Sequence, residues 1–389
     1  ESKDGIVIEL LRELSGSSYN SRRVATATFA ATCAGARDNG KIALDRNFIN
    51  AGYLMSQQTN KLGLHLSLVS SLFGSLGKLA QEAEESGYAS VWVAEVAGPN
   101  AFVALAPCAM ATKRVELATG VVPIQIRTPA VLAMETLALN ELSGGRAIAG
   151  LGVSSPVIVE RWHGASYRKP VTAMRECVHI MRELFTKGRC KFEGKVYKCD
   201  FRHSLVTSAP RAPRIYLAAL NPPMLRLAGE VADGVLLNYS PPEAVPAMIA
   251  EVRAGAEQAG RNSADVDIAI YLRMCVTEDE DKALESFKRE LAGYAFVDSY
   301  NEMFARYGLG DQFAEVRRLW REGKRDDAYK ALSDADMRRI GAFGSAKSAR
   351  DFVARFRAAG VNHPVIFPIG PGRTAERDFQ NTMRAMVGA

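Results

Sequence analysis

The sequence predicts an α/β protein folded as a (β/α)8 barrel with inserted helices. From Lys61 to Phe367, eight short apolar segments alternate with helical patterns, as in a closed barrel of parallel strands. The segment 115–155 reads as strand, helix, strand, a unit whose two strands pair in parallel. The alternative, an open doubly wound sheet, would need a GxGxxG turn after its first strand, and LHLSLVSSLFGSLG contains none.

The segment 115–155 shows the pattern most clearly. VELATGVV is a β-branched strand, and RAIAGLG is the next buried strand. Between them, Thr128 is the expected N-cap and Pro129 the first residue of a helix that GGR ends. Glycine and polar residues follow both strands. They lie at carboxyl ends, where parallel α/β folds build their sites.

The other elements follow in chain order. In KLGLHLS, Leu62, Leu64 and Leu66 alternate with His65, so the leucines face the helices and His65 points into the barrel near its mouth. The predicted strands are 61–66, 90–94, 115–121, 146–151, 214–218, 234–238, 265–275 and 363–367. The predicted helices are 74–87, 101–111, 128–143, 155–163, 170–187, 223–231, 242–259, 279–292, 345–359 and 375–387. Residues 295–335 are helical and charged, with no strand signal.

The segment CKFEGKVYKC, residues 190–199, predicts a hairpin that turns at Glu193-Gly194. Such a turn would pair residue 190 with residue 197. Cys190 and Cys199 would then be out of register, and no disulfide is expected between them. The six cysteines form no CxxC motif and no zinc spacing, so we expect buried thiols in a reducing compartment.

Composition narrows the class of protein. A hydrophobic content of 48% and a charged content of 24% fit a soluble globular protein with a full core. The net charge of +6 is spread along the chain, which disfavours nucleic-acid binding but suits an anionic ligand. No membrane-spanning run and no signal-peptide layout are present, so we expect no membrane partner and a cytoplasmic location. Residues 1–60, rich in Ser, Ala, Thr and Gly, are interpreted as an N-terminal extension of unknown role, and residues 61–389 as the barrel domain.

Turns after the strands are the candidate binding elements. The glycines of GLGVSS, residues 150–155, let backbone approach a flat ring or a phosphate, while Ser154 and Ser155 can cap the next helix. Asn221 can cap the helix that starts near Pro222. Ordinary turn chemistry is the alternative reading of both turns.

Two titratable residues are candidates for proton transfer. His65 is either a group that handles a proton or a hydrogen-bonded core histidine. Glu95, which ends the second strand, is either a second such group or a helix cap or salt-bridge partner. Trp162 could form a wall of the substrate pocket or simply pack. Arg127 and Lys169 could meet an anionic tail or be solvated surface charges.

Several segments together resemble the bacterial luciferase-like superfamily, in particular its F420-dependent oxidoreductase branch. The segments that carry the likeness are AQEAEESGYASVWVAE, VELATGVVP, RTPAVLAMETLALNELSGGRAIAGLGVS, APRIYLAALNPPMLRLAGEVADGVLLN and FGSAKSARDFVARFRAAGV. They span most of the chain from Lys61 onwards. The resemblance implies a (β/α)8 barrel with F420 or FMN across the carboxyl ends of its strands.

The resemblance also implies a set of cofactor contacts. A cis peptide bond between Gly120 and Val121 would lie behind the ring, and the loops after the fifth and sixth strands would bind the phosphate. The implied cofactor-binding residues are Gly120, Val121, Gly152, Val153, Ser154, Ser155, Ala218, Ala219, Leu220, Asn221 and Asn238.

The function that the resemblance implies is F420-dependent hydride transfer to or from a small organic substrate. Many F420-dependent relatives carry Lys or Arg just after the sixth strand, where this chain has Asn238, Tyr239 and Ser240, so the choice between F420 and FMN stays open. An FMN-dependent monooxygenase using reduced flavin and O2 is the first alternative, and a non-catalytic binding subunit is the second. By analogy with relatives, a homodimer is expected.

Overall fold

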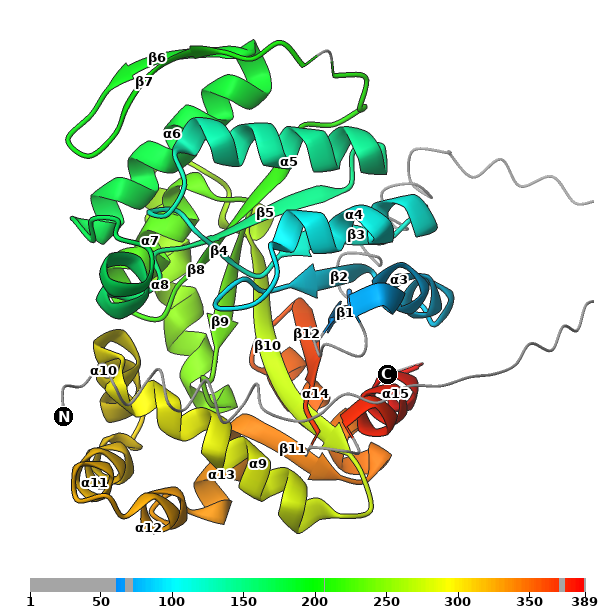
Figure 1. Cartoon of the computed structure of the whole chain (residues 1–389), viewed down its shortest axis with the longest axis vertical. Coiled ribbons are helices and arrows are strands. Elements are labelled where there is room, and N and C mark those ends of the chain that lie inside the picture. Colours follow the sequence, from blue (N-terminus) through cyan, green and yellow to red (C-terminus); the bar gives the residue numbers. More distant parts are fainter. Residues whose placement is uncertain (1–60, 67–72, 206, 371–374, 388–389) are drawn as a thin grey trace, which may run out of the picture.

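The computed structural model describes residues 61–66, 73–205, 207–370 and 375–387. Parallel strands close into a barrel in the order β1, β2, β3, β5, β8, β9, β10, β12 and back to β1, and helices surround it (Figure 1). The predicted barrel is therefore confirmed. The predicted N-terminal extension, residues 1–60, lies outside the described residues.

Each predicted strand is present, and the barrel is in continuous register. Leu64 lies opposite Ile366 on one side and Val91 on the other, so β12 closes the barrel onto β1. The barrel strands are β1 (Gly63–His65), β2 (Ser90–Val93), β3 (Glu116–Thr119), β5 (Ala147–Gly152), β8 (Arg214–Ala218), β9 (Gly234–Asn238), β10 (Asp267–Val276) and β12 (His363–Pro368). A two-residue strand, β4 (Val122–Pro123), also pairs with β5.

The helices that cover the barrel follow the predicted order. In α5, the Thr128 hydroxyl accepts the Val131 N–H, Pro129 stands in the first turn, and Gly144 ends the helix in the left-handed conformation. The segment 155–163 forms only a six-residue π-helix, η2 (Val157–Trp162). The main helices are α3 (Leu76–Glu85), α4 (Ala101–Ala111), α5 (Pro129–Ser143), α6 (Pro170–Lys187), α7 (Pro222–Val231), α8 (Val245–Gln258), α14 (Ala346–Ala358) and α15 (Ala375–Ala385). None of the helices in the described ranges is both long and apolar enough to cross a membrane.

The insert between β10 and α14 has its own apolar core and one strand that the sequence did not predict. Its helices are α9 (Glu280–Ala292), α10 (Asp298–Arg306), α11 (Gly310–Arg321), α12 (Arg325–Lys330) and α13 (Asp334–Ile340), grouped at one side of the barrel (Figure 1). The strand β11 (Gly341–Gly344) pairs in parallel with the end of β10. Two of its four residues are glycine, so its local strand propensity is low. The free backbone groups of β10 supply the pairing instead.

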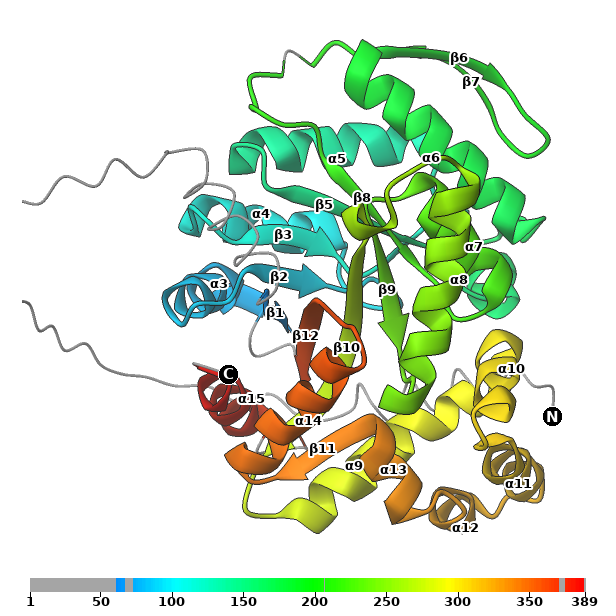
Figure 2. The same cartoon turned by 180° about the vertical axis from the view of Figure 1, so that it is seen from behind.

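The hairpin of β6 (Arg189–Glu193) and β7 (Lys198–Arg202) lies against α6 (Figure 2), but in a different register from the predicted one. Cys190 lies opposite Phe201 rather than residue 197, because the turn is longer. The Glu176 carboxylate of α6 accepts the N–H groups of residues 195, 196 and 197 and so holds this longer turn. Cys190 and Cys199 are still not opposite each other, and both are free thiols, as expected.

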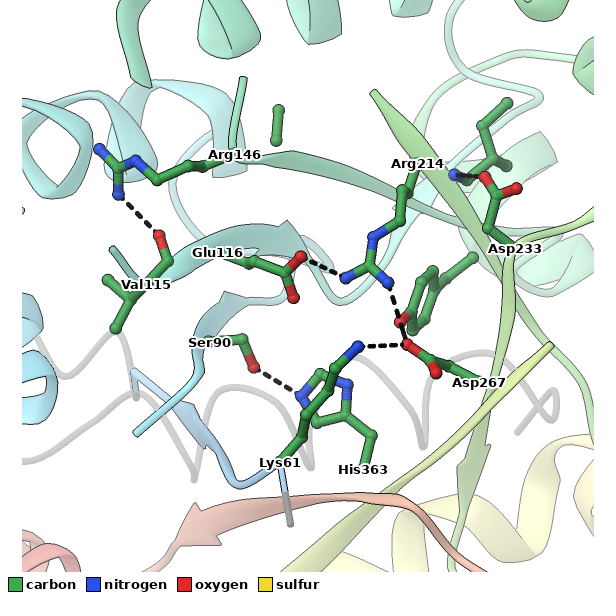
Figure 3. A network of polar contacts seen from close by, with 12 residues as sticks. Lys61, Ser90, Val115, Glu116, Arg146, Arg214, Asp233, Asp267 and His363 are labelled. Carbon is green, nitrogen blue, oxygen red and sulfur yellow. Dashed lines mark hydrogen bonds and ion pairs between the residues drawn. The ribbon is translucent and has the colours of Figure 1, made fainter. Parts of the chain in front are cut away.

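Charged side chains at the strand starts form a connected network inside the barrel (Figure 3). The Asp267 carboxylate pairs with Lys61 Nζ at 2.9 Å and Arg214 at 3.0 Å, and accepts the Tyr216 hydroxyl. Arg214 also pairs with Glu116. Burial alone would raise the pKa of Asp267, but Lys61, Tyr216 and Arg214 lower it to about 2. The amino-terminal end of the barrel is therefore closed by paired charges, which suits a role in stability.

His363 belongs to the same closed end. Its Nε2 lies 2.8 Å from the Ser90 hydroxyl, which also accepts the Trp92 indole N–H at 2.7 Å (Figure 3 shows His363 and Ser90). Burial lowers the pKa of His363 to about 3, so the ring is uncharged at neutral pH.

Candidate active site

The carboxyl ends of the barrel strands form the mouth of the barrel. Buried side chains fill the middle of the interior, and they are Trp92, Ala118, Ile148, Tyr216, Leu236, Ala269, Tyr271 and Val365. Because inward-facing positions alternate along each strand, the next ones toward the mouth follow from the sequence. Those on or just after β2, β3, β5 and β8 are Ala94, Gly120, Gly150 followed by Gly152, and Ala218, here called the small half. Those on β9, β10, β12 and β1 are Asn238, Arg273, Phe367 and His65, here called the polar half.

The small half presents backbone where other barrels carry side chains. A Cβ on Gly120 would lie 1.8 Å from the Tyr271 hydroxyl oxygen, and a Cβ on Gly152 would lie 2.5 Å from Val121 Cγ2. The Tyr271 hydroxyl donates to the Gly120 carbonyl at 2.6 Å. The Gly120–Val121 peptide bond is cis, as the resemblance implied. Only glycine fits these positions, because the protein's own side chains pack directly against the backbone there.

The turn after β5 continues the small half. Val153 and Ser154 are half-buried, and Ser154 has a φ of 58°. The Ser155 hydroxyl accepts the Ile158 N–H at 3.5 Å, which is the capping interaction that the sequence predicted for this turn. Ser154 makes no such cap, so its hydroxyl is the one of the pair that the turn leaves for a ligand.

The loop after β8 contains Ala218, Ala219, Leu220 and Asn221, and Asn221 differs from its predicted role. It occupies the N-cap position of α7, but its side chain does not cap that helix. The Asn221 amide instead donates to the Ser299 carbonyl at 3.2 Å and to Glu302 at 3.0 Å, because α10 lies next to this loop. The Asn221 side chain is therefore hydrogen-bonded to the insert, and no side chain caps the first N–H groups of α7.

Asn238 links the barrel to the insert in a similar way. Its amide donates to the Tyr300 hydroxyl of α10 at 2.7 Å, and its carbonyl oxygen accepts from the Arg273 guanidinium. Arg273 is 3% exposed and pairs with Glu290 of α9 at 3.4 Å. Glu290 also accepts the Tyr239 hydroxyl. Burial alone would lower the pKa of Arg273, but Tyr239 and Glu290 raise it, so the guanidinium stays charged.

His65 is buried in the polar half without a hydrogen-bond partner. The residue is 3% exposed, and neither ring nitrogen has a hydrogen-bond partner in the part of the chain that the structure describes. Its ring stacks on Phe367 with centroids 3.7 Å apart and meets the edge of Tyr271 at 5.2 Å. Burial, and then the charge of Arg273, lower the pKa of His65 well below its usual value. The ring is therefore an uncharged imidazole with a free N–H and a free lone pair.

Glu95 is engaged in both of the structural roles considered for it. One carboxylate oxygen accepts the Ala101 N–H at the start of α4 at 2.8 Å, and the other pairs with Arg127 at 2.6 Å. Arg127 also pairs with Glu135 at 3.2 Å. Arg127 is thus neither a solvated surface charge nor free for an anionic tail, whereas Lys169 is exposed. A role for Glu95 in proton transfer stays a prediction.

Residue-by-residue reading of the sequence missed two polar side chains of the mouth. Arg273 was taken as part of a buried strand, although it shares an alternating face with Ala269 and Tyr271, and a charge on that face was the available signal. Gln125, in the loop after β4, has both amide atoms buried and unpartnered. No pattern marked it. Trp162, which the sequence did single out, also has a buried indole N–H without a partner.

The arrangement fits a ring cofactor better than a metal. Within the described ranges, no group of three or more His, Cys, Asp or Glu side chains could hold a metal ion. The small half offers a surface where glycine is required, and the mouth loops and strands carry buried polar atoms of His65, Gln125 and Trp162 that a ligand could satisfy. An uncharged imidazole beside such a surface can accept or donate one proton.

Comparison with known proteins agrees with this architecture. The 5,10-methylenetetrahydromethanopterin reductase of Archaeoglobus fulgidus is 30% identical over 298 residues, covering 75% of this chain and 89% of that protein. The F420-dependent glucose-6-phosphate dehydrogenase of Kineococcus radiotolerans is 32% identical over 250 residues, covering 59% and 72%.

The chain is also similar to a solved structure and to the sequence model of a protein family. The F420-dependent tetrahydromethanopterin reductase of Methanopyrus kandleri superimposes with a TM-score of 0.70 at 23% identity, covering 84% of this chain and 97% of that one, and so shares the fold. The sequence model of the luciferase-like monooxygenase family matches residues 57–363, which include most of the barrel. The chain therefore belongs to the luciferase-like monooxygenase family and is an enzyme of that family.

Proposed function

We propose that this enzyme is an F420-dependent oxidoreductase that transfers a hydride between the deazaflavin and a small organic substrate. The observation that carries the proposal is that the barrel mouth combines positions where only glycine fits with a buried His65 that has no hydrogen-bond partner among the described residues. Hydride chemistry needs a positioned ring and one group that moves a proton. The proposal is also supported by relatives named as F420-dependent among the most similar proteins.

The residues of the small half would hold the cofactor. Gly120–Val121 would lie behind the ring and Gly152–Ser155 along its edge. The loop Ala218–Asn221 would place the phosphate at the start of α7, because the free N–H groups of a helix N-terminus favour an anion. Asn238 would border this pocket from β9. Bound there, F420 supplies a ring carbon that accepts or gives a hydride.

His65 would move the proton that accompanies the hydride. Oxidation of an alcohol to a carbonyl compound, for example, releases one hydride and one hydroxyl proton. The free lone pair of His65 can take that proton and pass it to solvent, and the reverse transfer serves reduction. Glu95 is the second candidate for this role. Since both of its oxygens are engaged, it would first have to leave Ala101 or Arg127.

An FMN-dependent monooxygenase is the alternative function. It is favoured by the sequence Asn238-Tyr239-Ser240 after β9, which carries no Lys or Arg for the longer anionic tail of F420. The same small half would then hold the flavin ring, and the chemistry would need reduced flavin and O2 shielded from water.

A binding titration separates the two. The purified full chain is titrated with F420 and with FMN, and quenching of cofactor fluorescence is followed. Saturable binding of F420 alone is the expected result, whereas binding of FMN alone would replace the proposal by the alternative. Gly152→Val should weaken binding at least tenfold, because its side chain would collide with Val121. The control Gly74→Ala, at an exposed position with no positive φ and no atom near the added Cβ, should bind like the parent chain.

We also propose that the chain forms a homodimer. The outer faces of α4 and α5 carry exposed apolar side chains, namely Val103, Met110, Val131, Met134 and Leu142. The two helices pack side by side, and exposed apolar side chains on neighbouring helices are typical of association sites. Light scattering should give the mass of a dimer. Met110→Glu should shift it to a monomer, and an unchanged dimer in that variant would move the interface elsewhere.

A further inference from the structure

Four side chains from four strands or strand ends stack on one another in the polar half. Phe367 lies 3.7 Å from His65, ring to ring, and 4.1 Å from the Arg273 guanidinium carbon. Two groups cannot occupy the same face of one ring at such distances, so Phe367 lies between them. The guanidinium carbon is also 4.1 Å from the Tyr239 ring. The order of the stack is therefore His65, Phe367, Arg273, Tyr239.

The guanidinium in this stack is fixed from its edges as well as its faces. Asn238 accepts from one terminal nitrogen, and Glu290 pairs with Nε. Glu290 itself accepts the Tyr239 hydroxyl, and the Tyr239 ring contacts Tyr294 at 4.7 Å. The insert thus holds Arg273 in place, and Arg273 in turn holds Phe367 against His65.

The charge of Arg273 reaches His65 through this stack. Arg273 is the charged group, in the part of the chain that the structure describes, whose field acts on His65. The other titratable ring against His65 is Tyr271, whose pKa burial raises, so it stays a neutral phenol. Glu290 of α9 pairs with Arg273 rather than with His65. A proton added to His65 would therefore meet a buried like charge.

We infer that Arg273 is a positioning residue of this active site: it holds Phe367 against His65 and sets a fixed, buried positive charge one ring away from that imidazole. This inference rests on the proposed function for its meaning in catalysis, though not for its test. Arg273 needs no contact with substrate or cofactor for this role. An uncharged imidazole beside a fixed cation releases a captured proton readily, so His65 returns to its starting state after each turnover. The site accordingly suits a substrate that offers a hydroxyl or carbonyl oxygen to a neutral histidine rather than a carboxylate to an imidazolium.

The test is a pH titration of His65 by NMR on the full chain, with labelled histidine. The chain has only five histidines, and the His65→Gln variant identifies the His65 signals by their loss. Arg273→Met and Arg273→Gln both remove the charge, and Gln keeps a group that can bond Asn238. Arg273→Lys keeps the charge without the planar stack. In the parent chain we expect His65 to stay neutral down to the pH at which the chain unfolds.

In either neutral variant we expect His65 to take up a proton at a pH higher by about one unit or more, while Arg273→Lys follows the parent. The acid limb of kcat/KM should move with the NMR midpoint in the neutral variants. A folded neutral variant in which His65 titrates no earlier than in the parent overturns the inference. Because this titration needs no cofactor, a failure to bind F420 would refute the proposed function and leave the role of Arg273 to be decided by the same spectra.

Discussion

Two buried histidines at opposite ends of one barrel differ in what they bind. His363, at the closed end, and His65, at the mouth, are 0% and 3% exposed, and burial lowers the pKa of both. His363 shares a hydrogen bond with Ser90, and charged pairs surround it. Among the described residues, none hydrogen-bonds to either nitrogen of His65.

We infer from this difference that His363 serves the structure and that His65 serves the proposed function. An unpartnered buried polar group costs about 1–3 kcal/mol of stability, so a chain keeps one where something else completes it. At the closed end the protein supplies a partner for Nε2 of His363, although Nδ1 has none among the described residues. At the mouth neither nitrogen of His65 has such a partner, and under the proposed function a ligand would supply it.

The largest effect should come from breaking the closed end. Asp267→Ala would leave Lys61 without its carboxylate and Arg214 with Glu116 alone, and we expect a loss of about 3 kcal/mol in the free energy of unfolding. Urea denaturation measures this. Asp265→Ala, on the neighbouring exposed turn, is the control and should change little. Turnover per folded molecule should be kept, and a specific loss of turnover in Asp267→Ala would show that the closed end also serves catalysis.

The next effect should fall on activity. His65→Gln removes the free imidazole, and we expect kcat/KM to fall about 100-fold, whereas the free energy of unfolding should change little because no hydrogen bond is lost. Steady-state kinetics and denaturation on the same preparation measure both. A large loss of stability with normal turnover would reverse the assignment of His65.

The corresponding variant at the closed end, His363→Gln, should lower stability instead of activity. His363→Gln breaks the contact with Ser90, and we expect a loss of about 1.5 kcal/mol with kcat/KM unchanged for the folded fraction. Together with His65→Gln it forms a matched pair. If both variants lowered turnover equally, the contrast between the two ends would not hold.

The smallest expected effect is on how steeply the free energy of unfolding changes with pH. Both histidines have lowered pKa values in the folded chain, so the unfolded chain binds more protons below pH 6.5. Their contribution to stability is present above pH 6.5 and is lost as the pH falls. Between pH 6 and pH 5, each histidine should add about 1.2 kcal/mol per pH unit to the slope of the unfolding free energy. Replacing either one by Gln should remove one such increment, and an unchanged slope would mean that the replaced histidine is protonated in the folded state.

The barrel could be predicted because its signals are local and repeated. The alternation of Leu62, Leu64 and Leu66 with His65 placed that histidine correctly, and Thr128 and Pro129 marked the start of α5. What failed depended on distant partners. The hairpin register is set by Glu176 on another element, and β11 exists because β10 extends to meet it.

The candidate site divides in the same way. Glycine turns and the Gly120–Val121 bond could be anticipated from short motifs and resemblance. The engagement of Asn221 by α10 and the burial of Arg273 beside Glu290 could not, because they depend on how a separate group of helices settles on the barrel. The residues next to Asn221 and Arg273 in the sequence do not indicate these contacts.

The pairing of β11 with β10 has a consequence for how this enzyme could diversify. The insert leaves the barrel after Val276 and returns through Gly341–Gly344, which lies alongside that same end of β10. Its two attachment points are thus neighbours, and the chain between them can lengthen, shorten or be exchanged while the barrel strands keep their register. Glu290 and Tyr300 of this segment contact residues of the polar half. Such an exchange would therefore alter the polar half, where the proposed substrate would bind, and leave the glycines of the small half unchanged. The insert could therefore be exchanged while the barrel stays the same.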